Sequence, residues 1–172
     1  YDIIWPTLAL RKLAGSQVQV TPEELQQEFE THYGPMVQVR LIVCSSKEKA
    51  DRVHALATAQ PEQFGQLAKQ HSEDVNSASA EGLIQPVRKH VGVKEIEQTA
   101  FGMKPGEISS VLKVADQYVI LKCERHIPGR DIKEMQYILP QLEETIRDQK
   151  LRKVAHTIFR QLQEVSKVDV VY

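Results

Sequence analysis

The sequence of 172 residues has neither a marked excess of charge nor a long apolar run, the features that indicate nucleic-acid-binding and membrane proteins. Its formal net charge is −1, so no excess of positive charge points to nucleic acid or an anionic membrane surface as a partner. No apolar run approaches the ~18 residues of a membrane-spanning helix, which predicts no integral membrane segment, and we find no signal-peptide pattern. The first residue is Tyr1 and not methionine, which is typical of a processed protein or an excised fragment.

Cysteine and histidine are too sparse and too scattered for a metal or redox site. Cys44 and Cys123 fit no metal or redox motif, and the six histidines show no ligand spacing. We therefore expect no metal and no cofactor.

The first half of the chain shows helix, strand and helix patterns in sequence. Thr21-Pro22-Glu23-Glu24 combines an N-cap threonine, a proline at the first helical position and a capping-box glutamate, which predicts a helix that ends at Gly34-Pro35. Residues 37–44 form a predicted strand, with Val39, Leu41 and Val43 on one face. A helix capped by Ser45 or Ser46 is predicted to run to about Ala59, with Leu56 facing inward. A second helix is predicted at 61–71 and a loop at 74–82.

The most distinctive pattern lies between residues 99 and 125. Lys104-Pro105-Gly106 ends a predicted helix near Met103, because proline fixes φ and glycine supplies a positive φ. The runs 108–112 and 118–123 are apolar or β-branched, which predicts an antiparallel pair of strands with a short connection. Upstream, Arg88-Lys89-His90 lies in a segment that we interpret as irregular, solvated loop and not as a nucleic-acid site.

Both ends of the chain carry helical patterns. Residues 1–16 have apolar residues at near-helical spacing, a turn of helix is predicted at 133–139, and residues 168–172 are compatible with a strand. A long helix is predicted to begin at Pro140 and to run to about Ser166, with one apolar stripe that repeats every 3.6 residues. This stripe is open to two interpretations: a surface that binds other proteins, or a face that packs on the N-terminal helices. A lobe this small would need more helices than the sequence shows, so we expect either a homodimer or further sequence before Tyr1.

The predicted element order from Val37 to Arg125 resembles that of parvulin-type peptidyl-prolyl cis-trans isomerase (rotamase) domains. Local motifs agree, with FGMKPGEIS at 101–109 and HSED at 71–74, followed by a small-residue loop to Gly82. The flanks resemble those of SurA- and PrsA-type foldases. The resemblance implies an α+β fold, a four-stranded antiparallel sheet surrounded by helices at 36–127. Helical segments at 1–35 and 128–172 would flank it and pack together.

The same resemblance implies a role in protein folding. The partner would be unfolded or proline-containing polypeptide, and the location would be extracytoplasmic, periplasmic or surface, in a bacterium. A prolyl isomerase has to lower a rotational barrier of about 18–20 kcal/mol by favouring a twisted amide. Parvulins use a histidine on the first strand, a histidine on the last strand and a Cys or Asp after the second helix, together with an apolar slot for the proline ring.

The resemblance assigns these roles residue by residue. Arg40 and Val119 stand at the two histidine positions, and Asp74 keeps the acidic position as the candidate catalytic residue. An Arg beside a Val cannot reproduce a histidine pair, so we expect weak or absent isomerase activity. Matching Arg40 to Val119 places Cys44 opposite residue 115, away from Cys123, which predicts two buried free thiols.

The apolar slot is also changed. Gly92 stands where the family has methionine and Ile96 where it has phenylalanine, while Ile84 keeps an aliphatic side chain. We predict that these residues, with Arg40, Val87 and Val119, contact the substrate. The replacements at 92 and 96 open the slot and remove its aromatic contact.

Several alternatives stay open at this point. Asp74 is either a retained catalytic carboxylate or an ordinary cap residue. Arg40 either binds a peptide or pairs with Asp74 or Glu73 as a half-buried cation. For the whole chain, the rival of a polypeptide-binding foldase is a non-catalytic structural or assembly module that uses its helical lobe. A third interpretation is a true isomerase in which Asp74 and the slot suffice.

Overall fold

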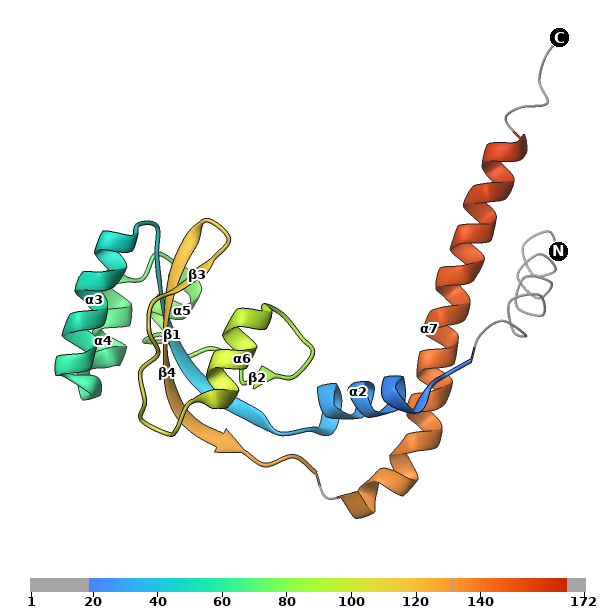
Figure 1. Ribbon diagram of the computed structural model, residues 1–172, viewed down its shortest axis with the longest axis horizontal. Helices are drawn as coiled ribbons and strands as arrows, with labels where there is room; N and C mark the ends of the chain where they lie inside the picture. The colour runs from blue at the N-terminus through green and yellow to red at the C-terminus, as the bar shows by residue number, and fades with distance from the viewer. Residues whose placement is uncertain (1–18, 131, 167–172) are drawn as a thin grey trace, which may run out of the picture. The chain divides into compact units, whose positions relative to one another are not determined.

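The computed structural model describes residues 19–130 and 132–166, and the chain divides into two compact units. One unit is residues 30–130, and the other combines residues 1–29 with 131–172 (Figure 1). The patterns expected at 1–16 and 168–172 lie outside the described residues.

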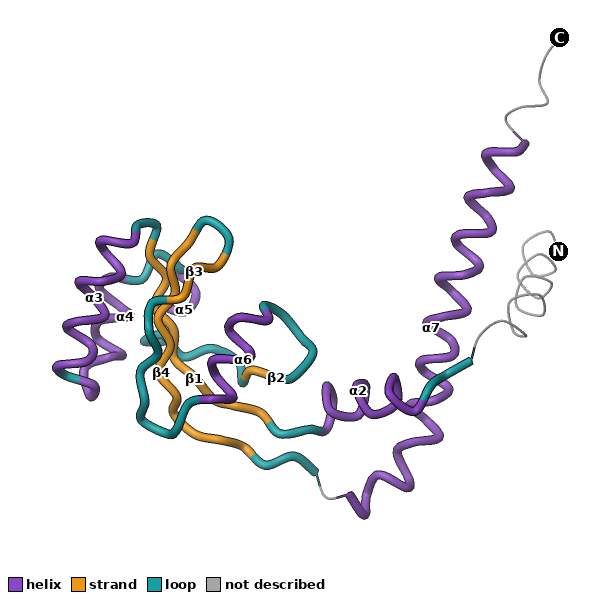
Figure 2. The backbone as a smooth tube through the Cα atoms, in the orientation of Figure 1, coloured by secondary structure: helices purple, strands orange, loops and turns teal. Residues whose placement is uncertain are grey.

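The unit 30–130 is built on a four-stranded antiparallel sheet. Its strands are β1 (Met36–Cys44), β2 (Val87–Arg88), β3 (Leu112–Val114) and β4 (Gln117–Ile127), in the order β2-β1-β4-β3 (Figure 2). The central pair β1–β4 is long and β2 and β3 are short. The α+β fold predicted from the sequence is thus confirmed.

Helices cover both faces of this sheet. They are α3 (Lys47–Ala59), α4 (Phe64–His71) after a 3-10 turn (Pro61–Gln63), α5 (Val75–Ser79) and α6 (Lys94–Gly102). Helices α3 and α4 lie on one side of the central strands and α6 on the other (Figure 1). Because helices cover both faces, β1 contributes buried side chains to two apolar clusters, with Val39, Leu41 and Val43 on the α6 side and Ile42 and Cys44 on the α3–α4 side.

Several local predictions hold and several need correction. Ser46 caps α3 by accepting a hydrogen bond from the Lys49 N–H, as expected, but Leu56 is exposed and not inward. The segment after Asp74 forms the short helix α5 where a loop was predicted. The first hairpin strand begins at Leu112 and not at residue 108, because the chain from 107 to 109 bonds to β4 only through isolated contacts.

The helical unit contains the long helix α7 (Ile132–Ser166), and α2 (Pro22–Tyr33) begins in this unit and ends in the other. The predicted capping box is present, since the Thr21 N–H donates to Glu24 and the Glu24 N–H donates to the Thr21 hydroxyl. Lys150 of α7 donates to the same glutamate. Helix α7 runs through Pro140, so the separate helix start predicted there is wrong.

The apolar stripe of α7 is buried at Leu142 and Ile146 and half-buried at Leu151, Val154 and Ile158. Among the described helices, none has an 18-residue stretch apolar enough to cross a membrane.

Candidate functional site

The pairing of β1 with β4 separates the two positions that correspond to the family histidines. Arg40 lies opposite Lys122, and Val119 lies opposite Val43. Since side chains alternate between the faces of a strand and directly paired residues share a face, Arg40 and Val119 project to opposite faces of the sheet. The predicted pairing of Arg40 with Val119 is therefore wrong, and these two residues do not form one site.

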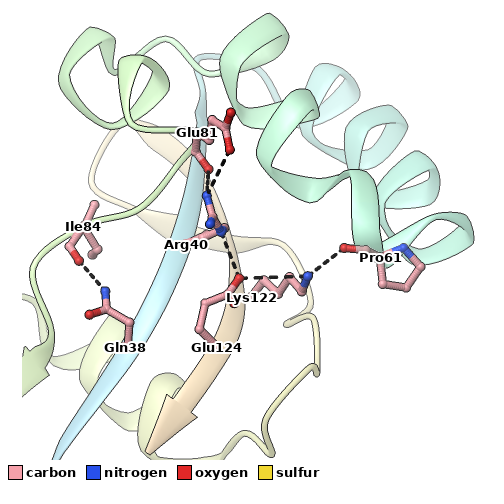
Figure 3. A network of polar contacts seen from close by, with 7 residues as sticks. All are labelled: Gln38, Arg40, Pro61, Glu81, Ile84, Lys122 and Glu124. Carbon is pink, nitrogen blue, oxygen red and sulfur yellow. Dashed lines mark hydrogen bonds and ion pairs between the residues drawn. The ribbon is translucent and has the colours of Figure 1, made fainter. Parts of the chain in front are cut away.

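Arg40 is held in a polar network on the α3–α4 side of the sheet (Figure 3). Its Nε donates to the Glu124 carboxylate at 2.9 Å and its Nη1 donates to the Glu81 carbonyl at 2.7 Å. Lys122 lies 3.9 Å from the same Glu124 oxygen and donates to the Pro61 carbonyl. Arg40 is thus a half-buried, paired cation as one of the two interpretations stated, but its partners are Glu81 and Glu124 and not Asp74 or Glu73.

Asp74 acts as the N-cap of α5. Its carboxylate accepts a hydrogen bond from the Ser77 N–H at 3.1 Å. Hydrogen bonding from the Ser77 side chain first, and then from the backbone N–H groups of Ser77 and Asn76, holds the pKa of Asp74 below its usual value. The neighbouring Glu73 pairs with Lys49 and Ser45. The carboxylate of Asp74 is therefore engaged in local structure, which is the cap role that the sequence left open.

An apolar pocket of about 360 Å³ lies between the segment 85–93 and α6. Its walls are mostly aliphatic, and Val91 and Val93 are 50% and 39% exposed, so the lining is accessible. The lining residues are Gln85, Pro86, Val87, Arg88, Val91, Gly92, Val93 and Ile96. The pocket therefore has the size and chemistry to take a small apolar ring or an aliphatic side chain.

Three of the six predicted substrate-binding residues meet in this pocket, namely Val87, Gly92 and Ile96. Ile84 packs against the adjoining apolar cluster, and Val119 is buried within that cluster at 4% exposure. Arg40 projects to the other face of the sheet. The pocket therefore brings together three of the six predicted residues, and Ile84, Val119 and Arg40 do not line it.

A tight turn shapes the pocket wall. His90 and Gly92 both have positive φ, at 63° and 90°, and this turn returns the chain toward α6. A Cβ on Gly92 would have no neighbour within 4 Å, so the space that a longer side chain would occupy is open. Sequence patterns did not reveal the roles of Pro86, Arg88 and Val93, although the aliphatic residues that recur around Gly92 are a signal for them.

The basic cluster at 88–90 fixes this wall to the last turns of α2. Lys89 and His90 both contact the Glu30 carboxylate, at 3.5 and 3.1 Å, and the His90 N–H donates to Glu97 of α6. Arg88 Nη1 donates to the carbonyls of Thr31 and His32 at 3.4 and 3.3 Å. The side chains of residues 88–90 therefore have a structural role, which differs from the solvated loop expected from the sequence.

Neither cysteine belongs to the site. Cys44 and Cys123 are free and buried, as predicted, and burial raises the pKa of each thiol. Within residues 19–130 and 132–166, no cluster of three or more His, Cys, Asp or Glu side chains could hold a metal ion.

Comparison with known proteins supports this assignment of the fold. Residues 44–125 match the model of the rotamase family, described as the PPIC-type PPIase domain. The foldase protein PrsA of Staphylococcus aureus (strain Newman) is 25% identical over 151 residues, which cover 83% of this chain and 45% of the relative. The chain thus spans about half the length of the curated relatives it matches.

Two solved structures are similar over most of the chain. The PrsA peptidylprolyl isomerase from Bacillus cereus is 26% identical, with a TM-score of 0.63 over 90% of this chain and 58% of that one. The foldase protein PrsA from Streptococcus pneumoniae str. Canada MDR_19A shares the fold at 22% identity, with a TM-score of 0.66 over 97% of this chain and 62% of that one. The sheet and the matched segment show that residues 44–125 form a PPIC-type (parvulin) domain, and the chain is similar to PrsA foldases over most of its length.

Proposed function

We propose that this chain binds extended, proline-containing polypeptide in the pocket between residues 85–93 and α6, as the parvulin-type module of a foldase, and that its isomerase activity is weak or absent. The observation that carries the proposal is the accessible apolar pocket itself. Of the three side chains that could fill the slot, Val91 and Leu83 are 50% and 41% exposed, whereas Val87 is half-buried against the adjoining apolar cluster. A filled slot is what a purely structural module would have shown.

We expect weak isomerase activity because the pocket lacks the polar groups that prolyl isomerisation needs. Rotation about the prolyl amide needs donors and acceptors placed around the moving carbonyl. Of the residues that line the pocket only Gln85 and Arg88 are polar, and neither a histidine nor a carboxylate is among them. Arg40 and Asp74 are engaged elsewhere, in the sheet network and in the cap of α5.

Two exposed valines offer a matched test of the binding site. Val91 lines the pocket, whereas Val75 is 78% exposed on α5 and is not part of the lining. We expect Val91→Ser to weaken the binding of a short proline peptide about three- to fivefold, because roughly 0.7–1 kcal/mol of apolar burial is lost. Val75→Ser should leave the Kd unchanged, and equal losses in both variants would contradict the assignment of the pocket.

A protease-coupled isomerisation assay on a panel of Xaa-Pro peptides tests the catalytic part. We expect turnover near the uncatalysed rate for the native chain and for Asp74→Ala. Robust turnover that is lost in Asp74→Ala would contradict the proposal, because it would show that the slot and this carboxylate suffice.

The same proposal includes the cellular location and the assembly of the protein. A bacterial, extracytoplasmic location (periplasmic or surface) fits the similarity to PrsA foldases. The helical segments at 1–35 and 128–172 are proposed to form one lobe that flanks the parvulin domain, and its size makes a homodimer part of the proposal.

A further inference from the structure

Arg88 is the one charged residue among the eight that line the pocket. The other lining side chains are aliphatic, apart from Gln85, and no carboxylate is among them. Because Arg88 is one of the lining residues, an extended peptide that places a proline ring on this apolar wall would pass the part of the pocket that Arg88 lines. The positive charge of Arg88 therefore affects how tightly peptides with different residues beside that proline bind.

The neighbouring basic residues differ from Arg88 in their partners. Lys89 lies 3.5 Å from the Glu30 carboxylate, so its charge is matched within the fold, and the His90 ring contacts the same carboxylate. For Arg88, in the part of the chain that the structure describes, no carboxylate lies within salt-bridge distance. The positive charge at the pocket is thus the one in this cluster that is not neutralised.

The contacts of Arg88 also hold it in place. Both of its side-chain hydrogen bonds use Nη1, and both acceptors are carbonyls at the C-terminal end of α2, where the helix dipole favours a cation. They leave Nε and Nη2 without a hydrogen-bond partner among residues 19–130 and 132–166. A guanidinium with free donors suits a carboxylate, which accepts two parallel hydrogen bonds.

We propose that Arg88 makes the pocket selective for proline peptides that carry an aspartate or glutamate next to the proline. This inference rests on the proposed function, because it assumes that the apolar pocket binds the proline segment. The carboxylate of the flanking residue pairs with Arg88 while the proline ring contacts the aliphatic wall formed by Val87, Val91 and Ile96.

The test uses the full chain, labelled with ¹⁵N, and capped five-residue peptides with one proline. The residue before or after the proline is Glu, Gln or Lys, and the Kd of each peptide is measured from the shifts of the pocket amides. We expect the Glu peptide to bind about three- to fivefold more tightly than the Gln peptide at low salt, and the Lys peptide most weakly. The preference for the Glu peptide should shrink at 0.5 M salt, because the Debye screening length falls to about 4 Å at that concentration.

Three variants locate the effect. Arg88→Gln should bring the Glu/Gln ratio of Kd values to about one, because a change in the pocket wall affects both peptides and cancels in the ratio, and Arg88→Lys should keep part of the preference. Lys94→Gln is the matched control, because Lys94 is a nearby exposed cation that does not line the pocket. This variant should bind as the native chain does.

The outcomes separate the two proposals. If the Glu and Gln peptides bind the pocket equally, or if the preference survives in Arg88→Gln, the role of Arg88 is refuted and the proposed function stands. If none of the peptides shifts the pocket amides, both proposals fail.

Discussion

Replacing Arg40 by methionine should destabilise the parvulin unit while leaving peptide binding intact. Methionine keeps the length of the side chain and removes its charge and its donors. Two charge-assisted hydrogen bonds are lost, to the Glu124 carboxylate at 2.9 Å and to the Glu81 carbonyl at 2.7 Å. The change thereby separates a structural role of Arg40 from a role in the binding site.

The size of the effect follows from exposure. Hydrogen bonds to charged groups contribute about 1.5–3 kcal/mol each when buried. The side chains of Arg40 and Glu124 are 23% and 31% exposed, and Lys122 lies 3.9 Å from the same Glu124 oxygen, so solvent and a second cation reduce the loss. We expect a fall of about 2–3 kcal/mol in the free energy of unfolding of the unit.

Native-state amide exchange at Leu41 and Leu121 measures that fall, because both amides lie on the central strands. Arg52→Met is the control: Arg52 is exposed on α3, its contact is a carbonyl of its own turn at 3.4 Å, and the expected change is within about 0.5 kcal/mol. A loss below about 0.5 kcal/mol in Arg40→Met, or an equal loss in Arg52→Met, would refute the reasoning. A weakened peptide Kd in Arg40→Met would show that Arg40 belongs to the binding site.

Three further predictions concern the cap of α5, a glycine and the thiols. Asp74→Ala should cost about 1 kcal/mol of unfolding free energy at pH 7. Because hydrogen bonding lowers the pKa of Asp74 in the folded state, the deficit should shrink as the pH falls below about 4, which acid titration of stability by circular dichroism checks. Gly82→Ala should cost more than Gly106→Ala in chemical denaturation: both have positive φ, but a Cβ at Gly82 would lie 2.8 Å from a side-chain carbon and a backbone oxygen, whereas Gly106 has open space. Cys44 and Cys123 should react with iodoacetamide only as fast as the unit unfolds, because both are buried with raised pKa values, and rapid labelling under native conditions would contradict this.

Local signals in the sequence predicted the elements of the fold well. The capping box at Thr21, the cap at Ser46 and the alternation in β1 each depend on neighbouring residues, and all three are present. The helix α5 was missed because its residues are small and polar, which is also the composition of a loop. Its signal was the capping aspartate, Asp74.

The strand register could not be predicted for a physical reason. Helices cover both faces of β4, so Val119, Ile120 and Leu121 are all apolar and their order does not reveal which face each occupies. A bulge between Gln38 and Val39 shifts the pairing further along the strand. An odd shift in register moves every side chain to the other face.

The polar partners of Arg40 and the pocket wall also depend on distant contacts. Glu81 and Glu124 lie 41 and 84 residues from Arg40 in the sequence, so adjacent acids were the more obvious candidates. The wall is shaped by positive φ values at His90 and Gly92, which composition does not predict for a histidine.

The most direct test of the central claim is an amide-shift titration of the full chain with a short proline peptide. The account predicts shifts concentrated at residues 85–96, around the pocket, with amides near Arg40 and Asp74 unchanged. Shifts confined to other parts of the chain, or no shifts at millimolar peptide, would contradict the claim that this pocket binds proline-containing polypeptide.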